Sequence, residues 1–247
     1  IKVHPKTLRA VAHWLLAKKY CSVENTGTFC DIGSGPGYSF QAAKFLNIKT
    51  KMFAFEGDKY SRESLRSMGV NVFNSVFTPS IELPPEKFKT VFMSHVLEHY
   101  TRSEIIPILK IVKEMLDKDG VFICEVPNNP KDFLNDKKIN VAPHLTFWTE
   151  QSLQRAFELA GLNCLFVSSC GNPLNLVEGR SSSHELARKM DLKIVIENFL
   201  ISCPPLYKSI SYIKNFRNKN SIFQMLSNDT FQYGKGRTVL RAVGSIR

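Results

Sequence analysis

The sequence predicts an α/β protein built on a doubly wound, mostly parallel sheet. Strand-like and helix-like segments alternate along most of the chain, and a glycine-rich turn at 33–37 stands between the first strand-like segment and a helix. Such alternation gives right-handed strand–helix–strand units, with helices on both faces of the sheet. Ligands of these sheets bind at the carboxyl ends of the strands, so we expect the functional site on that rim.

The individual elements follow from apolar spacing and turn residues. A helix is expected over residues 7–20, because Leu8, Val11, Leu15 and Leu16 share one helical face. Ser103 is expected to be the N-cap of a later helix. After the first helix we expect strands starting at Thr28 and over 51–56, 70–73, 90–94, 121–126, 162–169 and 237–243, with helices over 38–46, 59–68, 103–116 and 150–160.

The segment from 172 to 235 interrupts this alternation, because apolar and cationic residues are mixed there. We therefore expect one domain over 1–247. It comprises an N-terminal helix within 1–24, a core sheet from 25–171 and 236–247, and a helical insertion at 172–235. Long insertions are often functional, so this one is expected to be an acceptor lid or a dimer element, with a surface decoration as the alternative.

Composition limits the location and the partners of the protein. Hydrophobic residues make up 43% of the chain, and no apolar run reaches the length of about 18 residues that a membrane span needs. The six cysteines form no CxxC pair and the N-terminus lacks a signal-peptide pattern, so we expect buried thiols and a cytoplasmic location. The net charge of +11 fits a phosphorylated substrate, nucleic acid or a basic surface. Its scatter along the chain argues against nucleic acid.

The glycine-rich turn predicts a nucleotide-like cofactor. Glycines let a backbone approach a ligand closely, and the N–H groups of a helix start attract polar or anionic atoms. A nicotinamide-binding G-x-G-x-x-G fingerprint is absent, because Tyr38 stands at the third glycine position, and a GK[ST] loop is also absent. What remains is Asp31 followed by three alternating glycines, with Glu56 at the end of the second strand, where a carboxylate can accept ribose hydroxyls.

Together these motifs resemble class I S-adenosylmethionine-dependent methyltransferases of the small-molecule group (type 11/type 23-like), which includes ubiquinone-pathway and sugar methyltransferases. The resemblance covers about residues 25 to 170. It implies an enzyme with a Rossmann-like sheet of seven strands, the last antiparallel, that uses S-adenosyl-L-methionine and releases S-adenosyl-L-homocysteine. The matching segments are 31–37, 56, 74–76, 94–99, 144–149, 152–153 and 160–162. The cofactor-binding residues it implies are Asp31, Gly33, Ser34, Gly35, Gly37, Glu56, Gly57, Ser75, Ser94 and His95.

Within that resemblance, two residue roles are expected to be structural or cofactor-related. Asp31 is expected to fix the glycine loop through backbone N–H groups. Glu56 is expected to hold the ribose. The chain departs from the common family pattern at Glu56-Gly57-Asp58 and at Asn74-Ser75, where the family more often has other residues, so the contacts to the adenine stay open.

Three histidines on the expected rim are candidates for catalysis: His95, His99 and His144. A hydroxyl acceptor gains from a general base, and histidine is the usual supplier. His144 is the first choice, with packing against the next helix as its alternative. His95, Glu98 and His99 would share one face of a helical turn and could bind a divalent metal, as in some quinone O-methyltransferases. We favour a structural cluster there and expect no bound metal.

Three functions compete. The first is methylation of a hydroxyl or related group on a sugar, nucleotide-sugar or surface-glycan precursor, which the basic insertion suits if the acceptor is phosphorylated. The second is metal-assisted O-methylation of a quinone or phenol, with the apolar part of the insertion as a lid. The third is a non-catalytic cofactor-binding protein of the same fold. A homodimer is an open alternative for the assembly.

Overall fold

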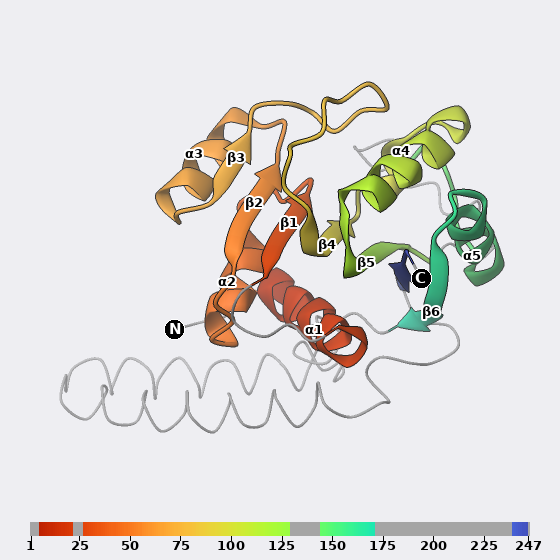
Figure 1. The fold of residues 1–247 in the computed structure, drawn as a ribbon, viewed down its shortest axis with the longest axis horizontal. Helices are drawn as coiled ribbons and strands as arrows, with labels where there is room; N and C mark the ends of the chain where they lie inside the picture. The colour runs from red at the N-terminus through yellow and green to blue at the C-terminus, as the bar shows by residue number, and fades with distance from the viewer. Residues whose placement is uncertain (1–4, 22–26, 129–143, 171–238, 247) are drawn as a thin grey trace, which may run out of the picture.

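The central feature of the computed structural model is a seven-stranded sheet in the order β3-β2-β1-β4-β5-β7-β6 (Figure 1). The structure describes residues 5–21, 27–128, 144–170 and 239–246. The strands are β1 (Thr28–Ile32), β2 (Lys51–Phe55), β3 (Asn71–Phe73), β4 (Phe88–Ser94), β5 (Leu116–Pro127), β6 (Asn163–Cys170) and β7 (Val239–Ser245). The helices are α1 (Pro5–Tyr20), α2 (Tyr38–Phe45), α3 (Lys59–Ser67), α4 (Arg102–Met115) and α5 (Glu150–Leu159), with a 3₁₀ turn η1 (Leu97–His99).

The strand directions confirm the predicted fold class. Strands β1 to β5 pair in parallel, whereas β7 runs antiparallel to both of its neighbours, β5 and β6. The strand order reverses at β1, which lies between β2 and β4. At such a reversal the loops after the two central strands lead to opposite faces, and a crevice opens between them. Here those loops begin at Gly33 and His95.

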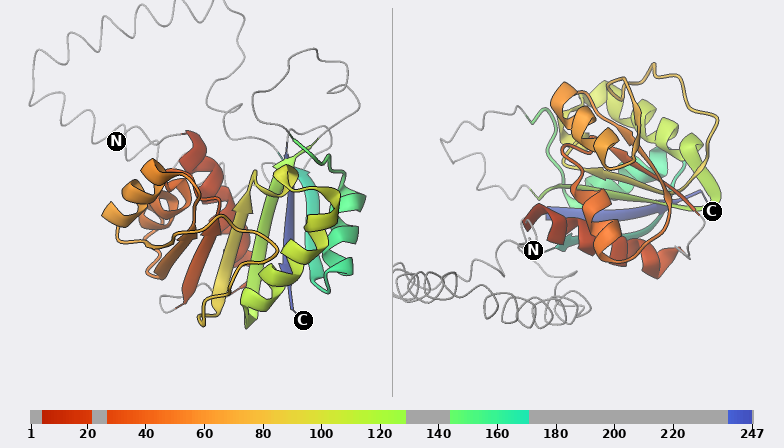
Figure 2. Two further views of the ribbon diagram at one scale, coloured as in Figure 1. Left: turned by 90° about the horizontal axis from the view of Figure 1, so that it is seen from above. Right: turned by 90° about the vertical axis from the view of Figure 1, so that its left-hand side faces the viewer.

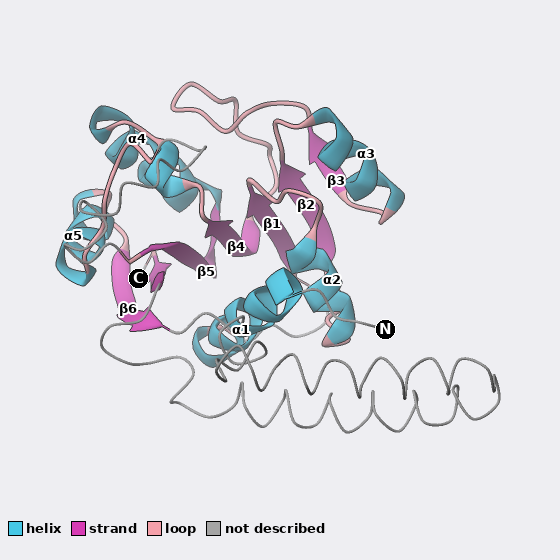
Figure 3. Cartoon of the chain, turned by 180° about the vertical axis from the view of Figure 1, so that it is seen from behind, coloured by secondary structure: helices cyan, strands magenta, loops and turns pink. Residues whose placement is uncertain are grey.

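Helices cover both faces of the sheet (Figures 1 and 3). On one face α1 and α2 pack on β1 and β4, and Trp14 of α1 is the centre of this layer. Its ring lies 4.5 Å from that of Phe29 and 4.9 Å from that of Phe92, and its indole N–H donates to the carbonyl of Ser39 over 2.9 Å. On the other face α4 and α5 bury Phe157 against Phe122. The side views in Figure 2 show the strands lying side by side between these layers.

The predicted elements agree with the structure apart from differences at their ends, the largest at β5, which begins at Leu116 although a strand was expected only from Val121. The N-cap of α4 is Thr101 instead of Ser103. Thr101 and Glu104 form a reciprocal capping box, in which the Glu104 carboxylate accepts from the Thr101 N–H over 2.9 Å. The predicted insertion at 172–235 lies outside the described residues, so its role and the domain division stay predictions.

The described cysteines behave as predicted. Four of them are buried, Cys164 is half-buried, and all five are free thiols. Among the described helices, none combines the length and the apolar character that crossing a bilayer requires.

Candidate functional site

The glycine loop has a backbone that only glycine adopts easily. Gly33, Gly35 and Gly37 have φ values of 69°, 53° and 91°. A Cβ on Gly33 would stand 2.3 Å from Cγ2 of Val96, whereas a Cβ on Gly35 would meet no atom within 4 Å. The first glycine is therefore needed for the close approach of two loops. The second faces open space on the rim.

Glu56 holds this loop from the neighbouring strand. Its Oε2 accepts from the N–H of Gly35 over 2.6 Å, and its Oε1 accepts from the N–H of Asp58 over 2.8 Å. A carboxylate has about four acceptor positions, so two remain for a ligand. Glu56, the residue that was predicted to bind the ribose, thus also holds the glycine loop in place.

Asp31 does not bond to the loop backbone, so that part of the sequence prediction is wrong. Its carboxyl is buried and accepts from the hydroxyl of Ser39 at the start of α2. Burial raises the pKa of Asp31 to about 7; the charge of Glu56 acts in the same direction, and the Ser39 hydrogen bond opposes them. Glu56 does for the loop what Asp31 was predicted to do, because its side chain approaches the loop from β2.

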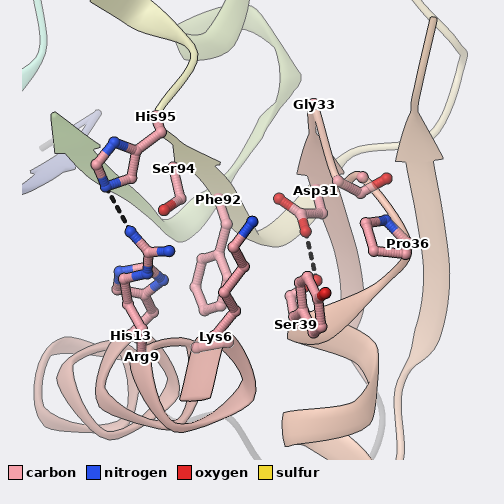
Figure 4. Close-up of a pocket in the computed structure, with 14 residues that line it drawn as sticks. Lys6, Arg9, His13, Asp31, Gly33, Pro36, Ser39, Phe92, Ser94 and His95 are labelled. Atoms are coloured by element: carbon pink, nitrogen blue, oxygen red, sulfur yellow. Dashed lines mark hydrogen bonds between the residues drawn. The ribbon is translucent and has the colours of Figure 1, made fainter. Parts of the chain in front are cut away.

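A cavity of about 170 Å³ lies between α1 and the glycine loop (Figure 4). Its charged and polar lining comes from three parts of the chain: α1, the β1–α2 turn and the end of β4. The lining residues are Lys6, Arg9, Ala10, His13, Asp31, Gly33, Ser34, Gly35, Pro36, Tyr38, Ser39, Phe92, Ser94 and His95. Six of the predicted cofactor residues line this cavity: Asp31, Gly33, Ser34, Gly35, Ser94 and His95.

The other predicted cofactor residues lie along the same rim or beneath it. Glu56 is half-buried, and Gly57 and Ser75 are exposed after β2 and β3. Gly37 is the N-cap of α2, where a Cβ would stand 2.5 Å from Cε of Met68. Gly37 therefore serves the packing of α2 on α3.

A buried carboxylate behind the cavity is the main feature that the sequence analysis missed. Glu125 on β5 is fully buried; its Oε2 accepts from Nε of Arg241 over 2.6 Å and lies 2.9 Å from Nε2 of His13. Its Oε1 lies 3.5 Å from Nη1 of Arg9 and 3.3 Å from Nε2 of His95. Although burial alone would raise the pKa of Glu125, the charges of Arg241 and His13 and the histidine hydrogen bonds hold it well below its usual range.

Part of this cluster could have been predicted from the sequence. Glu125 and Arg241 are charged residues inside the otherwise apolar runs 121–127 and 239–243, a combination that is rare unless the charges are paired. Arg9 and His13 are four residues apart on α1 and so share one helical face. Charged residues in two apolar strands predict a buried ion pair, but not which helix completes it.

His95 has a left-handed backbone, with φ of 56°, and lies between two carboxylates. Its Nδ1 is 3.3 Å from Glu98 and its Nε2 is 3.3 Å from Glu125. Burial lowers its pKa, but the bonds to Glu125 and Glu98 prevail and raise it to about 9. Nη1 of Arg9 also lies 2.6 Å from Nε2 of His95. For this contact to be a hydrogen bond, Nε2 would have to be unprotonated and accept from Arg9. We favour the charged ring because carboxylates flank both of its nitrogens.

His99 and His144 meet at the other side of η1. Their rings lie 5.3 Å apart, and one donor atom each from Glu98, His99 and His144 falls within 4.8 Å of the others. Two backbone bonds place His144 there, because the N–H groups of Leu145 and Thr146 donate to the carbonyl of Glu98 over 2.8 and 3.1 Å. The expected helical face of His95, Glu98 and His99 is formed only in part: η1 begins at Leu97, and His95 contacts Glu98 through Nδ1 but turns its Nε2 toward Glu125.

Comparison with known proteins agrees with this architecture. Residues 7–166 match the family model described as a methyltransferase domain. No curated protein matches the chain by sequence. Among solved structures, a SAM-dependent methyltransferase from Archaeoglobus fulgidus has a TM-score of 0.56 at 15% identity, covering 95% of this chain and 91% of that one. A methyltransferase in complex with the Trm112 methyltransferase activator of Haloferax volcanii has a TM-score of 0.55 at 16% identity, covering 95% and 88%.

The sheet order, the antiparallel β7 and the glycine loop on the rim define a Rossmann-like methyltransferase fold. Because the family model spans well over half of its length, the chain belongs to the methyltransferase domain family.

Proposed function

We propose that this protein binds S-adenosyl-L-methionine and transfers its methyl group to a hydroxyl, or a related group, of a small polar molecule. The observation that carries the proposal is the cavity at the glycine loop. The hydroxyl of Ser34 is buried in its wall and has no hydrogen-bond partner among the described residues. A buried polar atom without a partner is costly, so the cavity suits a ligand that supplies one.

The residues around the cavity fit both ends of this cofactor. Arg9 and Lys6 of α1 line it and would attract the carboxylate of the amino-acid part. Asp31 lies on the opposite wall and suits the ammonium group. Glu56, farther along the rim, keeps acceptor positions for the ribose hydroxyls, and Gly57 and Ser75 stand next on the path toward the adenine.

When bound, S-adenosyl-L-methionine supplies a methyl group on a positively charged sulfur that a nucleophile can displace. The task of the chain is then to align the acceptor and remove its proton. His144 is the base that we propose, since its ring lies at the rim beside His99 and is only half-buried. His95 is better suited to electrostatic binding, because a ring held in the charged form cannot accept a proton.

The acceptor that we propose is a sugar, a nucleotide sugar or a surface-glycan precursor, because a net charge of +11 favours anionic, phosphate-bearing molecules. A screen with methyl-labelled cofactor against nucleotide sugars, glycans and phenols tests this directly. Label transfer to the first two classes supports the proposal. Transfer to phenols alone would favour the second candidate, and a protein that binds S-adenosyl-L-homocysteine without any transfer would favour a non-catalytic role.

The second candidate is metal-assisted O-methylation of a quinone or phenol, and a specific cluster favours it. Both carboxylate oxygens of Glu98 are buried without a hydrogen-bond partner among the described residues, although Oε1 has the ion-pair contact with His95. Two imidazoles and one carboxylate within 4.8 Å are a ligand set for a divalent transition metal. Such an ion would lower the pKa of a bound phenol hydroxyl.

Equilibrium dialysis with Zn²⁺ and Mn²⁺ separates the two candidates without an activity assay. For the second candidate we expect one ion per chain in the wild type and loss of that ion in Glu98→Gln, with no loss in the exposed control Glu63→Gln on α3. A wild type that takes up no ion rejects the metal-assisted reaction and leaves His144 as the base.

A further inference from the structure

We propose that Glu125 is a positioning residue of the cofactor pocket. From behind the pocket wall, the Glu125 side chain holds α1 in place and orients Arg9 toward the carboxylate of the cofactor's amino-acid part. The inference rests on the proposed function, and it assigns a task to a residue that does not itself line the cavity. Its basis is the set of contacts that one buried carboxylate makes with the wall.

Glu125 contacts the cavity wall through two segments that are distant in the sequence, α1 and the end of β4. Four of its partners, Arg9, His13, Ser94 and His95, line the cavity. Ser94 lies directly beside Glu125 in the register of β4 and β5, and the backbone N–H of His95 donates to the carbonyl of Glu125 over 2.8 Å. The end of β4, with the left-handed backbone of His95, is therefore fixed to β5 at this position.

The two carboxylate oxygens of Glu125 contact different residues of α1. Oε2 contacts His13 over 2.9 Å, deep in the helix interface, where His13 is 3% exposed. Oε1 faces Arg9, one turn nearer the N-terminus, whose side chain is 14% exposed and reaches the cavity. Figure 4 shows both side chains rising from α1 toward the end of β4. The first contact holds the helix, and the second holds the side chain that a ligand can reach.

Arg9 has donors left for a ligand in this arrangement. Its ion pair with Glu125 over 3.5 Å engages Nη1, the same nitrogen that lies beside His95. A guanidinium carries five N–H donors in a planar fork, so Nη2 and Nε remain for a carboxylate. Fixing one arm of the fork reduces the freedom that the side chain would lose when it binds.

The charge balance explains why a second arginine is present. A lone buried Glu125 would be costly, and Arg241 on β7, fully buried, pairs with it from the side away from the cavity over 2.6 Å. With Glu125 neutralised by Arg241, the positive charge of Arg9 is not cancelled and stays available to an anionic group. The cluster therefore has a surplus of positive charge on the side of the cavity.

The test compares two ligands that differ only at the amino-acid end. S-adenosyl-L-homocysteine carries the carboxylate, whereas 5′-methylthioadenosine keeps the adenosine and lacks the amino-acid part. In isothermal titration, Glu125→Gln should weaken binding of S-adenosyl-L-homocysteine by about tenfold or more, because the ion pair that orients Arg9 and the anchor of α1 are both lost. Binding of 5′-methylthioadenosine should change less than about twofold on the same grounds, since it makes no use of Arg9.

Two further variants keep the comparison interpretable. Phe122→Leu on β5 is the control: it lies on the opposite face against Phe157, so it lowers stability and should leave the ratio of the two affinities unchanged. If Glu125→Gln does not fold because Arg241 loses its ion pair with Glu125, Glu125→Gln combined with Arg241→Gln replaces the ion pair by a neutral one. The double variant should show the same selective loss.

The outcomes separate this inference from the proposed function. A wild type that binds neither ligand overturns the proposed function, and this inference with it. A wild type that binds both, with a folded Glu125 variant that binds both as well as the wild type or loses both equally, overturns the positioning role alone.

Discussion

Glu56 offers the sharpest test of how the glycine loop is held. Its carboxylate accepts from two backbone N–H groups, those of Gly35 and Asp58, over 2.6 and 2.8 Å. In Glu56→Gln one of the two oxygens becomes an NH₂ group, which cannot accept and would face an N–H. One hydrogen bond to a charged acceptor is lost, which is worth about 1.5–3 kcal/mol.

If the loop is ordered only when this bond is made, the whole loss appears in ligand affinity, as about a 10- to 150-fold increase in Kd. Because Glu56 is also the proposed acceptor for the ribose, which both ligands contain, S-adenosyl-L-homocysteine and 5′-methylthioadenosine should both bind more weakly. Isothermal titration measures this, with exposed Glu63→Gln as the matched control. Affinities of Glu56→Gln within twofold of the wild type would refute the assignment of Glu56 to the loop and the ribose.

Three further predictions concern the rim. Gly33→Ala should lower the melting temperature clearly more than Gly35→Ala, because only the first places a Cβ 2.3 Å from Val96, and equal losses in thermal melts would contradict the packing of these loops. His144→Asn should lower kcat at least about tenfold with little change in the KM for the cofactor, whereas unchanged turnover would reject this base. Since the folded pKa of Asp31 is raised to about 7, the stability it contributes is present at acid pH and is lost as the pH rises toward 7. Compared with Asp31→Asn in urea unfolding, the wild type should therefore lose about 2 to 3 kcal/mol between pH 5 and pH 8, and parallel curves would reject the raised pKa.

The fold was predictable because its signals are local. Apolar runs, the glycine turn and the stops at Gly69 and Gly161 each act within a few residues, and both stops have the positive φ values that end a helix (82° and 77°). The antiparallel β7 was not derivable from the residues. Only the resemblance to a known family implied it, because nothing local to 239–245 encodes the direction in which a strand enters a sheet.

The candidate site was predictable where one loop carries it and not where distant segments meet. Gly33 to Gly37 and the 94–99 segment were found because their residues are contiguous. The cluster around Glu125 joins residues 9, 13, 95, 125 and 241, and a single sequence gives no measure of such distances. The same reason explains why Glu56, and not Asp31, bonds to the loop: which carboxylate reaches the loop depends on how β1 and β2 lie beside each other.

The most direct test of the central proposal is the thermal stability of the purified wild type with and without S-adenosyl-L-homocysteine. A specific ligand at about 100 times its Kd stabilises the folded state by about 2.7 kcal/mol. For a chain of 247 residues this corresponds to an increase in melting temperature of about 5 to 10 °C. We expect that increase, together with a smaller one in Glu56→Gln at the same ligand concentration. A melting temperature that does not change with saturating ligand would contradict the assignment of the glycine-loop cavity to S-adenosyl-L-methionine.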